Sequence, residues 1–141
     1  MRSIKFRGKD QYGGEWWYGS LACFPDSQTA HIIPCGTCKN EEVTCDFVEV
    51  NPKTVGQFTG QIDKNGREIF EGDIVRYYDD IEDDLTTAPV VFHSDTCSFC
   101  AQPQLSDSVG ITAFWQFEVI GNIHDNPELQ KGGNNGETGS V

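Results

Sequence analysis

Residues 52–75 read PKTVGQFTGQIDKNGREIFEGDIV, and this stretch decides the fold that the sequence predicts. Apolar and polar side chains alternate along it, and Gly56, Gly60, Gly66 and Gly72 interrupt it at short intervals. Alternation with a period of two is typical of half-buried strands, and glycines between short runs are typical of turns. The stretch therefore predicts three short strands that are joined by two tight turns.

The first of these turns is centred on Asn65 and Gly66. Asn-Gly accepts positive φ and closes a tight hairpin, and Asp63 just before it can accept hydrogen bonds from the turn backbone. Residues 71–73, Glu-Gly-Asp, are predicted to form the second turn. The strand that follows, residues 73–78, has the clearest alternation of the three.

The same reasoning extends outward to the rest of the chain. Further strands are predicted at residues 4–7, 15–23, 29–33, 46–50, 89–93, 97–102 and 111–123, with residues 105–110 as a loop. Near the end, a short helix is predicted with Asn126 as its N-cap and Pro127 at its first position. The predicted fold is all-β, with small, strongly bent sheets in barrel- or sandwich-like units and at most one short C-terminal helix.

Domain organisation follows from length and composition. At 141 residues, with 37% hydrophobic and 11% aromatic residues, the chain can bury the core of about one domain. We expect a single all-β domain over residues 1–130, or alternatively two β-subdomains at roughly residues 1–55 and 56–130. Residues 131–141, KGGNNGETGSV, have almost no apolar side chains, so we expect a disordered tail.

The charge of the chain restricts its partners. The formal net charge is −12, whereas general nucleic-acid binders neutralise phosphates with a basic surface. We therefore expect no direct nucleic-acid partner. The acidity indicates either solubility alone, or a basic protein partner, or competition for a DNA-binding surface. In this acidic chain, four basic residues are grouped near the N-terminus: Arg2, Lys5, Arg7 and Lys9. Their role is either to neutralise neighbouring carboxylates or to bind a phosphate group.

The sequence also indicates the cellular compartment of the protein. The first residues lack the apolar segment of a secretory signal, and no apolar run approaches the ~18 residues of a membrane span. We expect a cytoplasmic protein with no membrane association, whose six cysteines are mostly reduced.

The run DDIEDD at residues 79–84 contains five carboxylates, which repel one another and favour a solvated loop. The run lacks the spacing of a dedicated calcium loop, so a specific metal site is not expected there. We predict that it takes part in partner contact, together with exposed aromatic side chains such as Tyr77 or Tyr78. The predicted interaction residues are Asp79, Asp80, Glu82, Asp83 and Asp84.

Two CxxC pairs are candidate metal ligands. Cys35 and Cys38 have the spacing of a zinc knuckle, and Cys97 and Cys100 have the same spacing. Together the four thiolates suit a structural zinc ion, but on a strand Cys97 and Cys100 would face opposite sides. We therefore expect small packed cysteines and no cofactor, with the zinc site as the alternative.

Motifs for enzyme chemistry are weak in this sequence. His31, His93 and His124 are scattered among apolar residues, and a nucleophilic pair such as Cys45 with His93 needs geometry that a sequence does not give. No GxSxG, HExxH or phosphate-binding glycine loop is present in the sequence. These observations favour a protein that is not an enzyme, and an enzyme with an unrecognised site stays as an alternative.

Three segments carry a resemblance to a known family. Residues 55–75 (VGQFTGQIDKNGREIFEGDIV), residues 4–7 (IKFR) and residues 117–129 (FEVIGNIHDNPEL) resemble the YopX family of phage- and prophage-encoded proteins. The resemblance implies a predominantly β fold with no established biochemical function, and it carries over no catalytic residue. The positions that match the family pattern are mostly turn formers: Gly56, Gly60, Asp63, Asn65, Gly66, Glu71, Gly72, Asp73, Gly121, Asn122, Asn126 and Pro127.

Taken together, the sequence predicts a non-enzymatic interaction module with an unidentified protein partner. Self-association into a homo-oligomer is a further expectation, because small sheets leave edges that a second copy can cover. The alternatives are an acidic DNA mimic or binder of a basic protein, a zinc-stabilised β module, and an enzyme.

Overall fold

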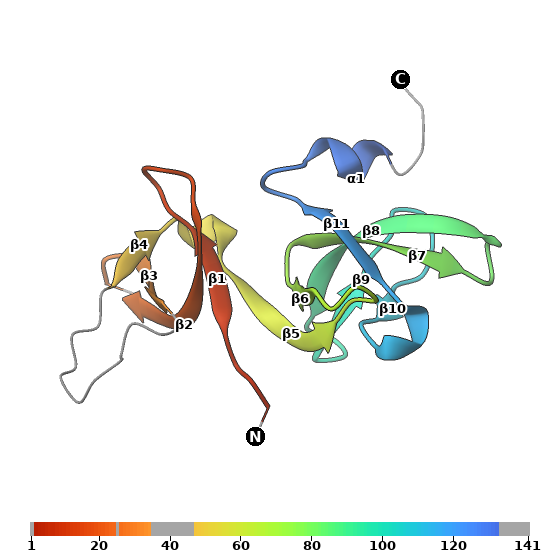
Figure 1. The fold of residues 1–141 in the computed structure, drawn as a ribbon, viewed down its shortest axis with the longest axis horizontal. Helices are drawn as coiled ribbons and strands as arrows, with labels where there is room; N and C mark the ends of the chain where they lie inside the picture. Colours follow the sequence, from red (N-terminus) through yellow and green to blue (C-terminus); the bar gives the residue numbers. More distant parts are fainter. Residues whose placement is uncertain (1, 25, 35–46, 133–141) are drawn as a thin grey trace. The chain divides into compact units, whose positions relative to one another are not determined.

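The computed structural model describes residues 2–24, 26–34 and 47–132 of the chain. It divides into two compact units, Met1–Phe58 (unit 1) and Thr59–Val141 (unit 2). In both units the regular structure of the described residues is almost entirely antiparallel β-strand (Figure 1). The prediction of an all-β fold with one short C-terminal helix is confirmed.

Unit 1 is built on an antiparallel sheet with the strand order β4-β3-β2-β1, followed by the first residues of β5. The strands are β1 (Phe6–Lys9), β2 (Trp16–Phe24), β3 (Thr29–Pro34) and β4 (Val48–Val50), with a short 3-10 helix, η1 (Pro52–Thr54), before β5 (Gly56–Ile62). Strands β1 and β2 form an antiparallel hairpin, in which Arg7 pairs with Tyr18 and Lys9 pairs with Trp16.

The core of unit 1 is small and lies on one face of this sheet. Ile32 and Val50 are fully buried, and Phe6, Trp17 and Leu21 pack against them. Strand β1 can approach Val50 closely because Gly8 has no side chain. A Cβ atom at Gly8 would lie 2.6 Å from Val50 Cγ2, well inside van der Waals contact.

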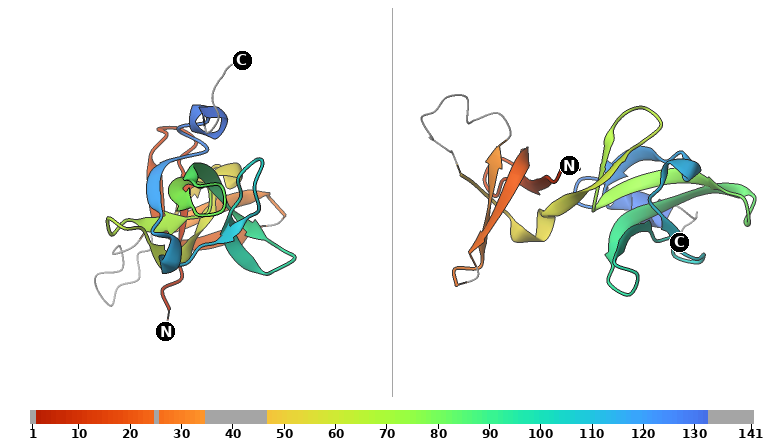
Figure 2. Two further views of the ribbon diagram at one scale, coloured as in Figure 1. Left: turned by 90° about the vertical axis from the view of Figure 1, so that its right-hand side faces the viewer. Right: turned by 90° about the horizontal axis from the view of Figure 1, so that it is seen from below.

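Unit 2 contains the last residues of β5 paired with β6, and a second antiparallel sheet with the order β10-β9-β8-β7-β11. Its strands are β6 (Glu68–Phe70), β7 (Asp73–Asp79), β8 (Asp84–His93), β9 (Ser98–Ala101), β10 (Val109–Gly110) and β11 (Glu118–Asn122), with the 3-10 helix η2 (Ala113–Trp115) and the helix α1 (Glu128–Gly132). Figure 2 shows that β7 and β8 are long and strongly curved, as expected for bent sheets.

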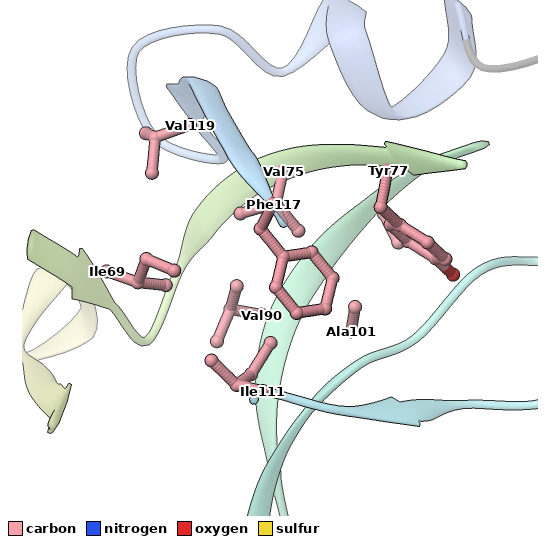
Figure 3. Packing of buried hydrophobic residues seen from close by; sticks show 9 residues of the cluster. Ile69, Val75, Tyr77, Val90, Ala101, Ile111, Phe117 and Val119 are labelled. Carbon is pink, nitrogen blue, oxygen red and sulfur yellow. The ribbon is translucent and has the colours of Figure 1, made fainter. Parts of the chain in front are cut away.

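The core of unit 2 lies around Tyr77 and Phe117 (Figure 3). Their rings meet edge to face with centroids 5.1 Å apart, and Trp115 adds a third ring 5.8 Å from Tyr77. Edge-to-face aromatic pairs gain about 0.5–1.5 kcal/mol beyond the burial of their apolar area. The other members of this cluster are Ile69, Val75, Ala88, Val90, Ala101, Ile111 and Val119.

Asp63 connects the β5–β6 hairpin of unit 2 to strand β11. Its Oδ1 accepts hydrogen bonds from the backbone N–H groups of Asn65 (2.9 Å) and Arg67 (2.8 Å), as predicted for the Asn-Gly turn. Its Oδ2 accepts a third from the N–H of Val119, at 3.0 Å. Next to it, the N–H of Lys64 donates to the carbonyl of Phe117 at 2.9 Å.

The environment of Asp63 favours its charged form. The residue is 5% exposed. Burial raises the pKa of its carboxyl, but the three N–H donors and the charge of Arg67 outweigh burial and hold the pKa below its ordinary value. Asp63 is therefore a structural carboxylate that is ionised in the folded protein at neutral pH.

Two predictions about residues 105–123 are wrong. Residues 111–123 are not one strand, because η2 and the left-handed Gln116 (φ 50°) interrupt the chain before β11 begins at Glu118. On either side of this break, Phe117 and Val119 are buried while Phe114 is exposed. The predicted loop at 105–110 ends in the two-residue strand β10, which pairs with β9.

The helix α1 begins at Glu128, one residue later than predicted. The side chain of Asn126 serves the preceding turn instead of the helix, because its Oδ1 accepts a hydrogen bond from the N–H of Asn122 at 3.2 Å. Within residues 2–24, 26–34 and 47–132, no helix combines the length and the apolar character that crossing a membrane requires. The predicted tail at 131–141 lies outside the described residues from 133 onward.

We predict that Asp63→Asn lowers the free energy of unfolding by about 2–3 kcal/mol at neutral pH, because a charged acceptor of three N–H groups is lost. The native pKa of Asp63 is depressed, so its contribution is present above the unfolded-state value of about 3.9 and is lost as pH falls through the native value. The difference between wild type and variant should therefore shrink in acid. Urea denaturation at a series of pH values measures it.

The exposed Asp107 provides a matched control. Asp107→Asn makes the same chemical change at the surface of unit 2, and its effect should stay within about 0.5 kcal/mol at every pH. Equal effects of the two substitutions would contradict the structural role of Asp63.

We also predict that Gly8→Ala lowers the free energy of unfolding of unit 1 by about 1–3 kcal/mol, because the added methyl group overpacks Val50. Gly13→Ala is the control, since a Cβ atom there meets nothing within 4 Å. Thermal denaturation of both variants tests this prediction, and an unchanged midpoint for Gly8→Ala would refute the packing argument.

Candidate functional site

The predicted acidic loop is the turn of the β7–β8 hairpin in unit 2, where Asp79 pairs with Asp84. Asp79 is only 5% exposed, and its Oδ1 accepts hydrogen bonds from the backbone N–H groups of Ile81 (2.9 Å) and Glu82 (3.2 Å). The Tyr78 hydroxyl is hydrogen-bonded to the carboxylate of Asp83, which has a left-handed backbone (φ 55°). These bonds fix the shape of the turn.

The carboxylates of the turn differ in what they can contact. Asp79 is turned inward and stabilises the turn itself, so it offers little surface to a partner. The other four predicted interaction residues are exposed: Asp80, Glu82, Asp83 and Asp84. We call these four residues the acidic turn. Ile81, at its tip, is 88% exposed.

A surface depression of about 330 Å³ lies beside the acidic turn. Strands β7, β8 and β11 and the helix η2 contribute its lining, which includes Arg76, Tyr78, Leu85, Phe114, Trp115 and Glu118. We call it the aromatic depression. It combines four aromatic residues, of which Tyr77 is otherwise buried, with charged groups, and this is the composition of many binding surfaces on proteins.

Opposite charges are paired within the aromatic depression. Arg76 donates to Glu118 Oε1 at 2.7 Å, across the β7–β11 strand pair. The hydrogen bond from Arg76, helped by the positive charge of Lys64, lowers the pKa of the Glu118 carboxyl. Glu118 is therefore ionised at neutral pH and holds Arg76 in place, so the pair is better suited to orienting a bound group than to transferring a proton.

Tyr77 lies below this surface. Burial, and secondarily the negative charge of Asp79, raises the pKa of its phenol to about 12. Its hydroxyl oxygen is buried without a hydrogen-bond partner among the residues that the structure describes. Tyr77 therefore stays neutral at physiological pH, and it is a core residue. Of the two aromatic residues that the sequence indicated for contact, only Tyr78 is exposed.

Sequence reasoning missed the contribution of Phe114, which is 76% exposed. A continuous strand was predicted there, and nothing in that pattern indicates a 3-10 turn. In the structure η2 directs Trp115 toward Tyr77 while Phe114 stays outside, with the two rings edge to face at 5.3 Å.

The basic residues near the N-terminus contact aromatic rings of unit 1. The guanidinium carbon of Arg7 lies 4.7 Å from the ring centre of Trp16, and Lys9 Nζ lies 5.9 Å from the same ring. Lys5 Nζ lies 5.5 Å from the ring centre of Phe58. These distances are typical of cation–π pairs, which stabilise the sheet without a phosphate group.

The proposed cysteine ligands are only partly described. Cys97 is exposed in the β8–β9 turn with a left-handed backbone (φ 51°), whereas Cys100 is buried in β9. Cys35 and Cys38 lie outside the described residues, as does Cys45, which was considered as a partner of His93. Over residues 2–24, 26–34 and 47–132, no group of three or more His, Cys, Asp or Glu side chains could hold a metal ion. The four-thiolate zinc site stays an alternative that the described residues do not test.

Three comparisons with known proteins bear on identity. No curated protein matches the chain. Among solved structures, the chain is similar to protein EF1440 from Enterococcus faecalis, with 26% sequence identity and a TM-score of 0.54. The match covers 93% of this chain and 100% of that protein. The family model described as YopX protein matches residues 5–131, which span nearly all of both units. The chain belongs to the YopX protein family.

Proposed function

We propose that this protein is a non-enzymatic interaction module that binds a protein partner through the aromatic depression and the acidic turn of unit 2. The observation that carries the proposal is the exposure of Tyr78, Leu85 and Phe114 around one depression. Large apolar side chains gathered at one concave place on a surface are typical of contact sites.

The rigidity of this surface supports the proposal. Tyr78 is held by Asp83, and Arg76 is held by Glu118, so neither side chain needs to be ordered when a partner arrives. Ordering free side chains opposes association, and a preorganised surface avoids much of this cost. Tyr, Trp and Arg are also the residue types that contribute most to binding at protein interfaces.

A second candidate is competition for a DNA-binding surface by an acidic mimic. The specific observation in its favour is the uneven charge, because unit 2 contains 15 of the 22 Asp and Glu residues but only 4 of the 10 Lys and Arg residues. A surface of this charge attracts basic proteins and speeds their association.

The cellular setting of this proposal comes from sequence reasoning alone. We infer a cytoplasmic role with a partner from a bacterial host or from a phage, since the YopX resemblance implies phage and prophage genes. A second copy of the chain is an alternative partner for the same surface.

We predict that a photo-crosslinking amino acid, benzoylphenylalanine, gives a discrete protein adduct when it replaces Phe114 in cells that naturally encode the protein. The substituted ring keeps the aromatic character of an exposed position, so the fold should be unaffected. Adding Tyr78→Ala to the same chain should reduce the adduct by about tenfold, because an aromatic contact worth more than about 1.4 kcal/mol is lost. Mass spectrometry identifies the adduct.

The matched control places the same amino acid at Tyr12, which is 87% exposed in unit 1. It should give no discrete adduct. The absence of an adduct at position 114, or the same adducts at both positions, would count against the proposal. An adduct with the mass of two copies would assign the surface to self-association.

A further inference from the structure

A second depression in unit 2, of about 230 Å³, is lined in part by residues of the acidic turn. Its lining includes Glu82, Asp84, Thr86, Pro103 and Leu105. Leu105 is 90% exposed, an unusual position for a large aliphatic side chain. We call this the leucine depression. Neither the predicted interaction residues nor the proposed function includes Pro103 or Leu105.

The two depressions meet at Leu85, which lines both of them and is 62% exposed. Three of the four carboxylates of the acidic turn line these depressions, with Asp80 in the aromatic depression and Glu82 and Asp84 in the leucine depression. At the end of the β7–β8 hairpin, each of the two depressions therefore combines exposed apolar side chains with at least one carboxylate.

We propose that one partner segment occupies both depressions: an extended basic peptide with an apolar side chain at each end and lysine or arginine between them. This inference rests on the proposed function and names the chemistry of the partner. One apolar anchor contacts Phe114 and Tyr78, and the other contacts Leu105. The intervening cations lie against Asp80, Glu82 and Asp84.

Charge complementarity selects this occupant over an acidic or a neutral one. Unit 2 has far fewer Lys and Arg side chains than carboxylates that they could pair with. One of these basic side chains, Arg76, is already paired with Glu118. An acidic segment would meet like charges on the acidic turn, whereas a basic segment would relieve their mutual repulsion. Exposed ion pairs add little affinity by themselves, so the apolar anchors provide the affinity and the charges provide the selectivity.

The test uses the full chain and fluorescein-labelled synthetic peptides that carry tryptophan and leucine at the two ends of a spacer. Spacers of about one to five lysines sample the separation of the anchors, since an extended chain rises about 3.3 Å per residue. Matched peptides contain glutamate in place of lysine. Fluorescence anisotropy gives the dissociation constants at about 0.05 M and about 0.5 M salt.

We expect at least one lysine peptide to bind about tenfold more tightly than its glutamate match at low salt, and this preference should shrink at high salt. Leu105→Ser and Phe114→Ser should each weaken that binding about fivefold, and Tyr12→Ser should leave it unchanged. All three side chains are more than two-thirds exposed, so the variants should keep the wild-type melting midpoint, which is measured alongside.

Equal binding of lysine and glutamate peptides, no binding of any peptide, or an effect of only one of the two depression variants would overturn the inference. Such a failure is distinguishable from failure of the proposed function. A partner adduct at position 114 together with no preference for lysine peptides would retain the interaction module and reject the basic two-anchor segment.

Discussion

The arrangement of unit 2 depends on one buried carboxylate that accepts three backbone hydrogen bonds. Asp63 ties the Asn-Gly turn of the β5–β6 hairpin to strand β11, which is 56 residues away in sequence at Val119. An ionised carboxylate with three well-placed N–H donors stabilises a turn and a long-range contact at the same time. Without that side chain, the N–H of Val119 would lose its acceptor inside the protein, which is costly for a buried donor.

The hydrogen bond between Asp63 and Val119 helps to position strand β11, which lines the aromatic depression. Strand β11 places Glu118 beside Arg76, and the residue before it, Phe117, packs on Tyr77 in the core. The chain that leads into β11 is η2, which turns Phe114 outward and Trp115 inward. A stable core on one side of β7 and β11 thus supports an exposed aromatic surface at their edge. This division between a buried and a displayed set of aromatic residues makes an interaction role physically reasonable.

Much of the fold was predictable because its signals are local. The turn at Asn65-Gly66 and the alternation in residues 73–78 each depend on neighbours only a few residues apart, and both predictions are confirmed. The interruption at Gln116 was not predictable, because alternation continues through it and glutamine is not a residue that favours the left-handed backbone it adopts there. The candidate site was predictable only in part. The acidic turn and Tyr78 were identified from sequence, whereas Phe114 and Leu105 gave no signal that distinguishes them from ordinary strand or loop residues.

By itself the sequence determined an all-β chain of the YopX type, the position of its tight turns and its strong negative charge. The strands follow from the alternation of apolar and polar side chains, and the turns follow from the backbone conformations that Gly and Asn allow. The charge follows from the amino-acid composition. Only the tertiary structure decided which carboxylates are buried and which are displayed. Asp63 and Asp79 are turned toward backbone N–H groups, while Asp80, Glu82 and Asp84 face outward. All five are acidic residues next to turns, and they differ in burial. Asp79 accepts its hydrogen bonds from Ile81 and Glu82 within its own turn. Asp63 also accepts one from the N–H of Val119, 56 residues away, and this contact depends on how distant strands are placed.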